Sequence, residues 1–181
     1  MRWFWIDRFL EFESGRHAVA VKNVSLAEDH LHDHFPGAPV MPNSLIIEGL
    51  AQTGGLLVGE HSGWEERVVL AKVSKATFYF AAVPGDTLIY RTQIEDISKG
   101  GAVISGTSHV GERLQAEVEI FFAHLDEQQA GKSLFDPVTF LAWLRMVGIF
   151  QVGRAADGSP LCIPPALLQA ERDYALTEIM R

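Results

Sequence analysis

The chain has 181 residues and a mass of 20.0 kDa, with 48% apolar and 21% charged residues, which fits one globular domain or one domain with an appendage. Its net charge of −8 argues against general nucleic-acid binding and against a polybasic membrane contact, because both need a positive surface. The single cysteine, Cys162, excludes an internal disulfide framework and a cysteine-built zinc site, so we expect a reducing, cytoplasmic setting.

Two apolar stretches are candidates for an export or membrane signal. The N-terminal stretch meets Asp7 and Arg8 before it reaches the length of a signal peptide. The stretch at residues 45–58 contains Glu48 and Gln52, and it is too short and too polar to span a bilayer. We therefore expect a protein without a membrane span.

Two β-strands are predicted near the N-terminus. Residues 8–13 alternate apolar and charged side chains, which is the pattern of a strand with one buried face. The Ser14-Gly15 pair that follows favours a turn, and residues 16–24 then read as a second strand.

A bent loop is predicted next. Residues 27–33 are rich in His and Asp, which is typical of a loop. Pro36, Pro39 and Pro42 follow within seven residues, and prolines at this density exclude a helix and restrict the preceding residues to extended backbone.

Residues 44–61 predict a helix that is apolar on nearly every side, as a buried helix is. Asn43 or Ser44 can cap its start by accepting a backbone N–H. Three glycines lower its intrinsic helicity, which indicates that another backbone packs closely against the helix. They are Gly49, Gly54 and Gly55.

Five further strands are predicted after the helix, separated by turns. They are residues 67–73, 76–82, 87–95, 102–109 and 112–124. In the last strand, alternate residues from Leu114 to Phe122 are apolar, whereas Gln115, Glu117 and Glu119 lie opposite, so one face of an antiparallel sheet is buried. Strands that follow one central buried helix imply a long curved sheet around that helix, an α+β fold.

The character of the chain changes after residue 125. Residues 127–133 form a polar linker, and the Asp136-Pro137 pair supplies a capping residue and the first residue of a helix. Apolar residues, among them Trp143, continue to Phe150 and predict a strongly apolar helix over this segment.

The last part of the chain is predicted to be a loop at residues 153–165 and a closing amphipathic helix at 166–180. We therefore divide the chain into two parts. A domain spans residues 1–125, and a C-terminal helical extension over residues 126–181 packs on or beside it.

Two ionisable side chains stand out by their positions. His34 opens the Pro- and Gly-rich loop, and Glu48 lies inside the most apolar helix. Apolar neighbours should desolvate the Glu48 carboxyl and favour its neutral, proton-donating form, and a histidine supplies the matching base. The alternative interpretation is a paired or outward-pointing Glu48 and a surface His34.

The string around these residues resembles a family signature. Residues 34–52 read HFPGAPVMPNSLIIEGLAQ, which closely resembles the approximate pattern H-F-P-G-x-P-x-M-P-G-x-L-x-x-E-A-x-A-Q of the (3R)-hydroxyacyl-acyl-carrier-protein dehydratases of the FabZ type. Residues 83–88 look like the strand-joining turn of this family. The resemblance covers about residues 7–124, and it implies the hot-dog fold, an antiparallel sheet wrapped around a central buried helix.

The resemblance implies an acid–base pair. His34 matches the base that removes the α-proton of the thioester, and the backbone carbonyl of Val40 is expected to steady its other ring nitrogen. Glu48 matches the acid that protonates the departing 3-hydroxyl group. Gln52 lies one helical turn beyond Glu48 and is expected to orient its carboxyl.

The resemblance also implies a thioester site at the start of the helix, where free N–H groups stabilise developing enolate charge. The donor in the family is the N–H of a glycine, whereas this chain has Asn43, which is its main departure. Gly37, in the loop after His34, is assigned to substrate binding. Gly49 replaces the usual alanine, a milder change.

The activity implied by the resemblance is dehydration of (3R)-3-hydroxyacyl-acyl-carrier-protein thioesters to trans-2-enoyl thioesters, in fatty acid or related lipid biosynthesis and without a cofactor. His and Glu meet across a dimer interface in this family, so we expect a homodimer, or a trimer of dimers, with acyl carrier protein as partner. Two alternatives stay open: a non-catalytic acyl-carrier-binding or partner subunit, and an acyl thioesterase.

Two further features carry weaker hypotheses. His30, His32 and His34 would share one face of a strand, as in some metal sites, but the adjacent prolines argue against a strand and we expect no metal. A local basic patch for an acidic carrier protein is a hypothesis for Lys72, Lys75 and Arg91. The apolar stripe around Trp143 is interpreted as packing against the sheet, with a lid or an oligomer contact as the alternative.

Overall fold

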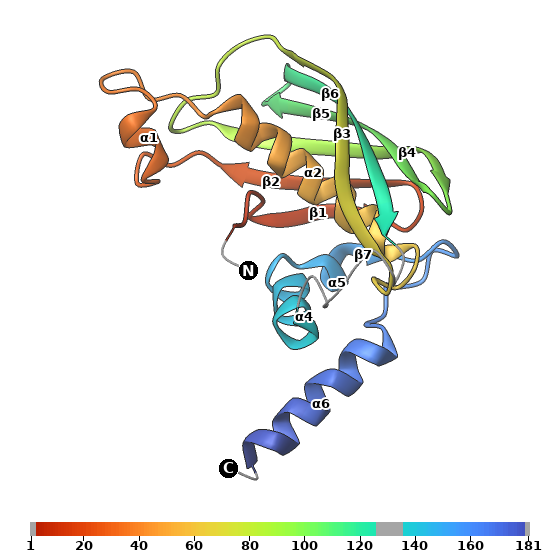
Figure 1. The fold of residues 1–181 in the computed structure, drawn as a ribbon. Helices are drawn as coiled ribbons and strands as arrows, with labels where there is room; N and C mark the ends of the chain where they lie inside the picture. Colours follow the sequence, from red (N-terminus) through yellow and green to blue (C-terminus); the bar gives the residue numbers. More distant parts are fainter. Residues whose placement is uncertain (1–2, 126–135, 180–181) are drawn as a thin grey trace.

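The computed structural model describes residues 3–125 and 136–179 (Figure 1). Within these described residues, seven strands form one sheet in the order β3-β6-β5-β4-β2-β1-β7. The strands are β1 (Arg8–Glu13), β2 (His17–Asn23), β3 (Arg67–Phe78), β4 (Thr87–Ser98), β5 (Gly101–Val110), β6 (Arg113–Leu125) and β7 (Gly153–Arg154). The helices are α1 (His30–Asp33), α2 (Asn43–Glu60), α4 (Pro137–Met146), α5 (Ile149–Val152) and α6 (Pro165–Ile179). No helix in this described part is long and apolar enough to span a membrane.

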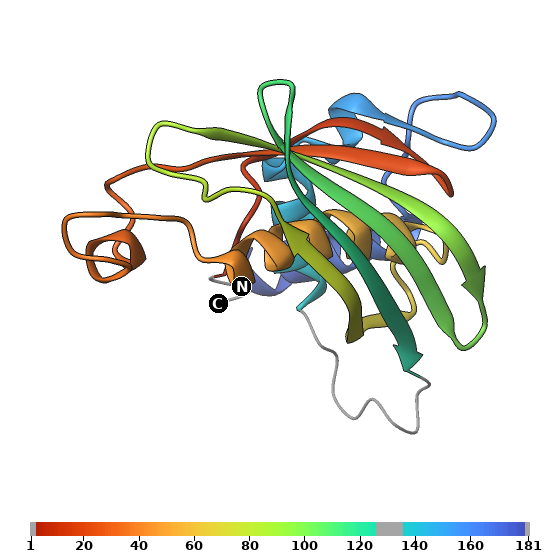
Figure 2. The ribbon, with the colours of Figure 1, turned by 90° about the horizontal axis from the view of Figure 1, so that it is seen from above.

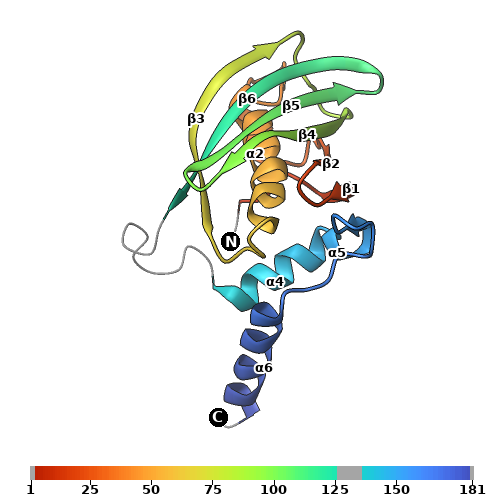
Figure 3. The same cartoon turned by 90° about the vertical axis from the view of Figure 1, so that its right-hand side faces the viewer.

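The sheet curves around α2, which runs along its concave side (Figures 2 and 3). Ile46, Leu50 and Leu57 lie on the face of α2 that is fully buried, in the same apolar core as Ile104 and Ile120 of the sheet. The apolar side chains of α2 recur every three or four residues, and those of the strands recur every two residues, so each set lies on one face and the two faces pack together. The predicted α+β arrangement with a central helix is confirmed.

Strands β1 to β6 pair antiparallel, as predicted, but β3 is one strand of 12 residues rather than two. The pairing of β3 with β6 shifts register between Leu70 and Lys72 and again between Val73 and Lys75. At each register shift one residue of β3 has no partner in β6, which interrupts the alternation and bends the strand without ending it. The prediction of two strands was wrong. β6 pairs with β3 on both sides of the break in alternation, and the local sequence pattern does not show this partner.

The histidine-rich loop contains a single helical turn, α1. His30 and His32 lie within this turn and His34 follows it, so the three side chains do not share one face of a strand. The strand geometry considered for a metal site is therefore absent. Among the residues that the structure describes, no group of three or more His, Cys, Asp or Glu side chains is placed to hold a metal ion.

The start of α4 follows the prediction. Asp136 precedes the helix with an extended backbone and accepts a hydrogen bond from the Thr139 N–H at 2.8 Å, and Pro137 occupies the first turn. The helix ends at Met146 instead of continuing to Phe150. Gly148 has a φ of 75°, a left-handed conformation that separates α4 from α5, so the expected single helix is two.

The segment after α5 contains a strand that the sequence analysis missed. β7 pairs with β1 in parallel, which makes the sheet mixed rather than purely antiparallel. Gly153 in this strand lies so close to Ile149 that a Cβ would come within 2.5 Å of the Ile149 carbonyl oxygen. A strand of two residues carries no readable alternation, so only the packing of α5 against β1 places it.

The closing helix is confirmed as α6, which extends away from the body of the molecule (Figures 1 and 3). Leu167 in its first turn is buried, and Arg145 of α4 forms an ion pair with Glu171. Tyr174 and Leu176 further along are exposed. The polar linker predicted at 127–133 lies outside the described residues.

Candidate functional site

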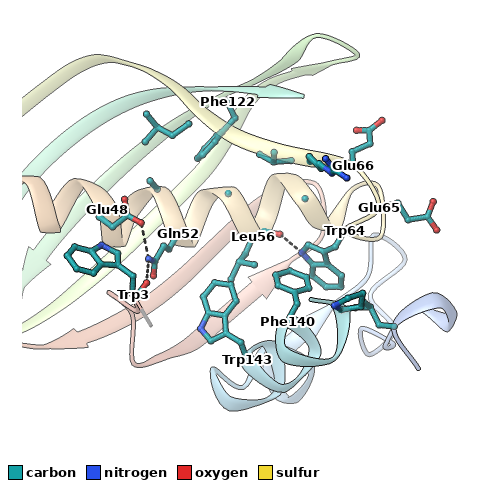
Figure 4. Close-up of a pocket in the computed structure, with 18 residues that line it drawn as sticks. Trp3, Glu48, Gln52, Leu56, Trp64, Glu65, Glu66, Phe122, Phe140 and Trp143 are labelled. Atoms are coloured by element: carbon teal, nitrogen blue, oxygen red, sulfur yellow. Dashed lines mark hydrogen bonds between the residues drawn. The ribbon is translucent and has the colours of Figure 1, made fainter. Parts of the chain in front are cut away.

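A cavity of about 480 Å³ runs along one face of α2 (Figure 4). Glu48 and Gln52 lie at one end of it beside Trp3, and Trp64 and Phe140 lie at the other end. Residues of α2 that line it recur every three or four positions, which is the spacing of one helix face. The helix therefore packs on the sheet with one face and lines this cavity with another.

Glu48 leaves α2 on the cavity side. Ile46 and Leu50 are fully buried toward the sheet, whereas Glu48 is half-buried and lines the cavity. Glu48 is less buried than its apolar sequence neighbours predict, because Ile46 and Leu50 point toward the sheet and away from the cavity. The carboxyl group is thus accessible to a molecule that enters the cavity.

Gln52 holds Glu48 and the N-terminal segment together (Figure 4). Its Nε2 donates to Glu48 Oε1 at 2.9 Å and to the Trp3 carbonyl oxygen at 2.7 Å, and its Oε1 accepts from the Trp5 N–H at 2.9 Å. The Trp5 N–H can only donate and the Trp3 carbonyl can only accept, so the amide orientation is determined. The predicted contact between Gln52 and Glu48 is confirmed.

Gly49 allows close packing directly beside Glu48. A Cβ at this position would lie 2.4 Å from the Tyr90 ring and 2.8 Å from the Trp5 carbonyl oxygen. The close backbone expected against the glycines of the helix is thus present at Gly49, whereas at Gly54 the nearest group is the Ile104 side chain. An alanine at position 49 would collide with Tyr90, which explains why this chain has glycine there.

His34 is held through one ring nitrogen. Its Nδ1 lies 2.9 Å from the Val40 carbonyl oxygen, and since a carbonyl only accepts, Nδ1 carries the proton of this hydrogen bond. The expected contact with Val40 is therefore confirmed. In the neutral ring Nε2 is then the bare nitrogen, which is the form that a general base requires.

The loop around His34 is closed by its own backbone. The Val40 N–H donates to the His34 carbonyl, and Phe35 and Ala38 exchange hydrogen bonds across the turn. Gly37 at the tip has a φ of 77° and open space where a side chain would be. This turn needs the conformational freedom of glycine, and it leaves the loop tip without a side chain.

The start of α2 differs from the predicted capping. Pro42 is the N-cap residue, and Asn43 and Ser44 are exposed helical residues without a side-chain capping hydrogen bond. Pro42 has an extended backbone and directly precedes the first helical residue, so the chain enters the helix without a side-chain cap. The first N–H groups of a helix have no partner within it, which leaves the Asn43 end of α2 as a hydrogen-bond donor toward solvent.

Two titratable groups close to the site have shifted pKa values. Burial lowers the pKa of His30, which packs edge-on against Trp5 with ring centres 5.1 Å apart, and the nearby Glu28 opposes the shift. Burial raises the pKa of the Tyr90 hydroxyl far above its ordinary value. Both side chains therefore stay neutral near pH 7 and support the site as packing groups.

The structure does not bring all the predicted site residues together within one chain. Glu48 and Gln52 line the cavity, whereas His34, Gly37 and Asn43 do not. Figures 1 and 2 show the reason, because the segment after α1 projects beyond the body of the molecule at the N-terminal end of α2. The hypothesised basic patch does not form either: β5 and β6 separate Arg91 from Lys72 and Lys75.

The outer wall of the cavity was not predicted from the sequence. Trp3 belongs to an N-terminal segment to which no role was given, and Phe140 and Trp143 belong to the C-terminal segment. Trp143 stacks on Phe4 with ring centres 5.3 Å apart, so this residue packs on the N-terminal segment. The later part of its stripe contacts the sheet as predicted, since the Phe9 N–H of β1 donates to the Val147 carbonyl oxygen at 2.8 Å and α5 packs on β1. Clustered aromatic residues at both ends of the chain were the available signal, but nothing local shows that they meet.

The sheet, the buried helix and the acid placed at a cavity define the class as a hot-dog protein. The FabA-like domain family matches residues 3–118. The 3-hydroxyacyl-acyl-carrier-protein dehydratase FabZ of Desulforamulus reducens is 40% identical over 121 residues, which is 65% of this chain and 84% of the relative. The relative of the same name from Symbiobacterium thermophilum is 39% identical over 122 residues, 67% of this chain and 86% of the relative. This chain belongs to the FabA-like family, and it is a dehydratase, a hydro-lyase.

Solved structures agree with the fold. The dehydratase heterocomplex ApeI:P from Xenorhabdus doucetiae has a TM-score of 0.59 at 14% identity, over 69% of this chain and 85% of that chain. The conserved protein PA5202 from Pseudomonas aeruginosa has a TM-score of 0.55 at 19% identity, over 65% and 87%. At this identity the likeness establishes the hot-dog architecture alone.

Proposed function

We propose that this chain dehydrates (3R)-3-hydroxyacyl thioesters of acyl carrier protein to trans-2-enoyl thioesters, in fatty acid or related lipid biosynthesis. The observation that carries the proposal is the Glu48–Gln52 pair at one end of an apolar cavity, combined with a His34 whose Nδ1 is already committed to Val40. The relatives are named 3-hydroxyacyl-acyl-carrier-protein dehydratases, which supports this proposal. Elimination of water leaves the overall oxidation state unchanged, so the chemistry needs only an acid and a base.

The proposed mechanism divides the elimination between His34 and Glu48. The bare Nε2 of His34 takes the proton from C2 of the acyl chain, and that electron pair forms the C2–C3 double bond. The C3–O bond breaks, and the Glu48 carboxyl protonates the departing hydroxyl, which leaves as water. His34 is then protonated and Glu48 ionised, and proton exchange with solvent restores both groups.

The start of α2 supplies the third part of the mechanism. Removal of the C2 proton places negative charge on the thioester oxygen, and the Asn43 N–H is a donor at the positive end of an 18-residue helix. The open backbone at Gly37 gives the thioester arm room to approach. Asn43 is exposed, so its side chain does not close this approach.

Each site is proposed to combine residues of two protomers, with His34 from one and Glu48 of the partner subunit. The projecting His34 loop and the cavity without His34 support this arrangement. Strand β3 supports it as well, because it is the last strand of the described sheet and has one unpaired edge, and such edges pair readily with a second chain. The homodimer is then the functional unit, and a trimer of dimers would preserve it.

The remaining expectations complete the proposal. Acyl carrier protein delivers the substrate, and the single cysteine fits work in the reducing cytoplasm. Residues 1–125 form the catalytic domain, and residues 126–181 form an extension of it.

The proposal is tested with a 3-hydroxyacyl carrier-protein substrate and three variants. His34→Ala and Glu48→Gln should each lower kcat by about 10²- to 10⁴-fold, because each removes one proton-transfer group. His32→Ala, in the same loop, should keep full activity. Formation of the enoyl thioester is followed by absorbance, and free thiol is measured in parallel.

Each other outcome of this assay identifies an alternative. Turnover retained by both His34→Ala and Glu48→Gln would refute the acid–base assignment. Release of free thiol would indicate a thioesterase, and carrier binding without turnover would indicate a non-catalytic subunit.

A further inference from the structure

The cavity along α2 ends against the C-terminal segment of the chain (Figure 4). Phe140 of α4 and Trp64 from the connection after α2 lie at this end, and Trp143 of α4 and Leu167 of α6 line the cavity as well. The FabA-like match stops at residue 118, so α4 and α6 lie outside the part of the chain that the family shares. The far end of the cavity is therefore built partly by the C-terminal segment, with Trp64 contributed by the part that the family shares.

This end wall is held by contacts on several sides. Trp64 donates its indole N–H to the Leu56 carbonyl oxygen at 3.1 Å, and its ring packs on Phe140 with centres 6.4 Å apart. Phe140 in turn lies 5.9 Å from Trp143, whose ring stacks on Phe4. These large side chains with few rotatable bonds form a wall rather than a yielding surface.

Charged residues lie beside the aromatic wall. Glu65 and Glu66 are exposed at the far end of the cavity, next to Arg67. An apolar chain gains free energy only while it stays out of water and away from charge, so it has no favourable path past this rim. The apolar part of the cavity thus has a defined length.

The length follows from the helix that lines it. From Glu48 to Gly59, where Trp64 closes against α2, the helix advances about 16 Å at about 1.5 Å per residue. An extended acyl chain advances slightly less per carbon than a helix does per residue, so this span holds roughly a dozen carbons. Phe122 of β6 and Leu56 of α2 provide apolar contact along the way.

We propose that the C-terminal helices α4 and α6 close the acyl cavity and set the longest substrate, with Phe140 as the specificity-determining residue at its end. The inference rests on the proposed dehydratase function, because it takes Glu48 as the position of the reacting carbons. The substrate class is a linear acyl chain of medium length, up to roughly a dozen carbons. Phe140 acts by steric exclusion and touches only the end of the chain.

The test measures kcat/KM of the full-length protein on 3-hydroxyacyl carrier-protein substrates of about 8 to 18 carbons. Wild type should show a steep fall beyond roughly 12 to 14 carbons, about tenfold for each step that no longer fits. Phe140→Ala should move this fall upward by about two to four carbons, because it removes the end wall. Phe140→Leu keeps an apolar side chain and should move the chain length at which kcat/KM falls by less. This variant replaces Phe140→Ala in the test if the alanine variant does not fold. Met146→Ala is the matched control, since Met146 is exposed on the same helix and does not line the cavity.

A binding assay separates this inference from the proposed activity. Saturated acyl thioesters of N-acetylcysteamine with the same chain lengths are titrated into wild type and variants by calorimetry. If no substrate is dehydrated but Phe140→Ala extends the length that binds, the wall is supported and the dehydratase assignment fails. If folded Phe140 variants keep the wild-type length limit in both assays, or wild type accepts all lengths equally, the proposal is overturned.

Discussion

The Gln52 side chain makes three hydrogen bonds at once. Both hydrogens of its amide nitrogen are donated, one to Glu48 and one to the Trp3 carbonyl, and its oxygen accepts from Trp5. The side chain thereby couples the orientation of the proposed acid to the placement of the N-terminal segment. It acts as a positioning residue, because it reaches the reacting atoms only through Glu48.

Replacing Gln52 tests this coupling. Gln52→Leu keeps the size of the side chain but removes all three hydrogen bonds, and we expect kcat to fall by up to about a hundredfold through misplacement of Glu48. KM should change less, since the apolar wall is retained. The emission of Trp3 and Trp5 should shift to longer wavelength as their segment loosens, which a purely chemical role of Gln52 would not cause.

The control for this variant is Gln93→Leu, at an exposed position on β4 remote from the cavity. Unchanged kcat and unchanged tryptophan emission in Gln52→Leu would contradict the positioning role.

At the scale of single residues, local rules predicted the contacts that depend on short spacing. Gln52 follows Glu48 by one helical turn, so this contact could be anticipated from spacing. The contact between His34 and Val40 was implied by the family resemblance instead. The partial exposure of Glu48 could not be anticipated. The sequence of the helix is apolar on nearly every side, and it does not show that one side lines a cavity. Capping by Asn43 failed for a similar reason, since Pro42 already directs the chain.

At the scale of secondary structure, α4 depends on its N-cap. The Thr139 backbone N–H and hydroxyl both donate to the Asp136 carboxylate at 2.8 Å, and these hydrogen bonds lower the pKa of Asp136 below its usual value. Its pKa is thus lower folded than unfolded, so the stabilisation is fully present above the unfolded value near 3.8 and is lost as the pH falls through the folded value.

Thermal unfolding followed across pH tests the cap. Asp136→Ala should lower Tm by roughly 2 °C at neutral pH, and the difference from wild type should vanish at acidic pH, where the wild-type carboxyl is protonated. Asp136→Asn, which retains a capping oxygen, should stay close to wild type at neutral pH. A difference between wild type and Asp136→Ala that persisted unchanged below pH 3 would show that the cap is not the cause.

Most elements were predictable because each carries its own periodic pattern, but two results were not local. Strand β3 continues through a break in its alternation because β6 pairs along its whole length. Strand β7 exists because α5 packs on β1 and brings Gly153 beside it. In both cases a partner distant in sequence supplies the hydrogen bonds, so the pattern of the strand alone is insufficient.

At the scale of the whole molecule, the proposed shared site makes a quantitative prediction. His34→Ala and Glu48→Gln chains carrying different affinity tags are co-expressed, and the assembly containing both is isolated. Each mixed dimer has one site with both residues intact and one with neither, so its activity should approach about half of wild type. Both parent homodimers should be inactive, since every site in them lacks one group.

The same experiment can contradict the arrangement. If the mixed assembly is as inactive as its parents, His34 and Glu48 of one chain must form each site, because no chain in the mixture has both. The control is a mixed dimer of wild type and His34→Ala, purified in the same way. It has one intact site of two, so its activity gives the value expected for the test dimer.

The sequence by itself determined the central helix, most of the strands around it and the cap of α4. These follow from local periodicity and short spacing, which act between residues near one another in the chain. Only the tertiary structure decided that Glu48 faces a cavity, that β7 joins the sheet, and that Trp3 and Phe140 from opposite ends of the chain line the same cavity. Burial of apolar surface is favourable for any contact that excludes water, whatever the separation of the two residues in the sequence. The local sequence pattern therefore does not show which distant residues will contact each other in the folded chain.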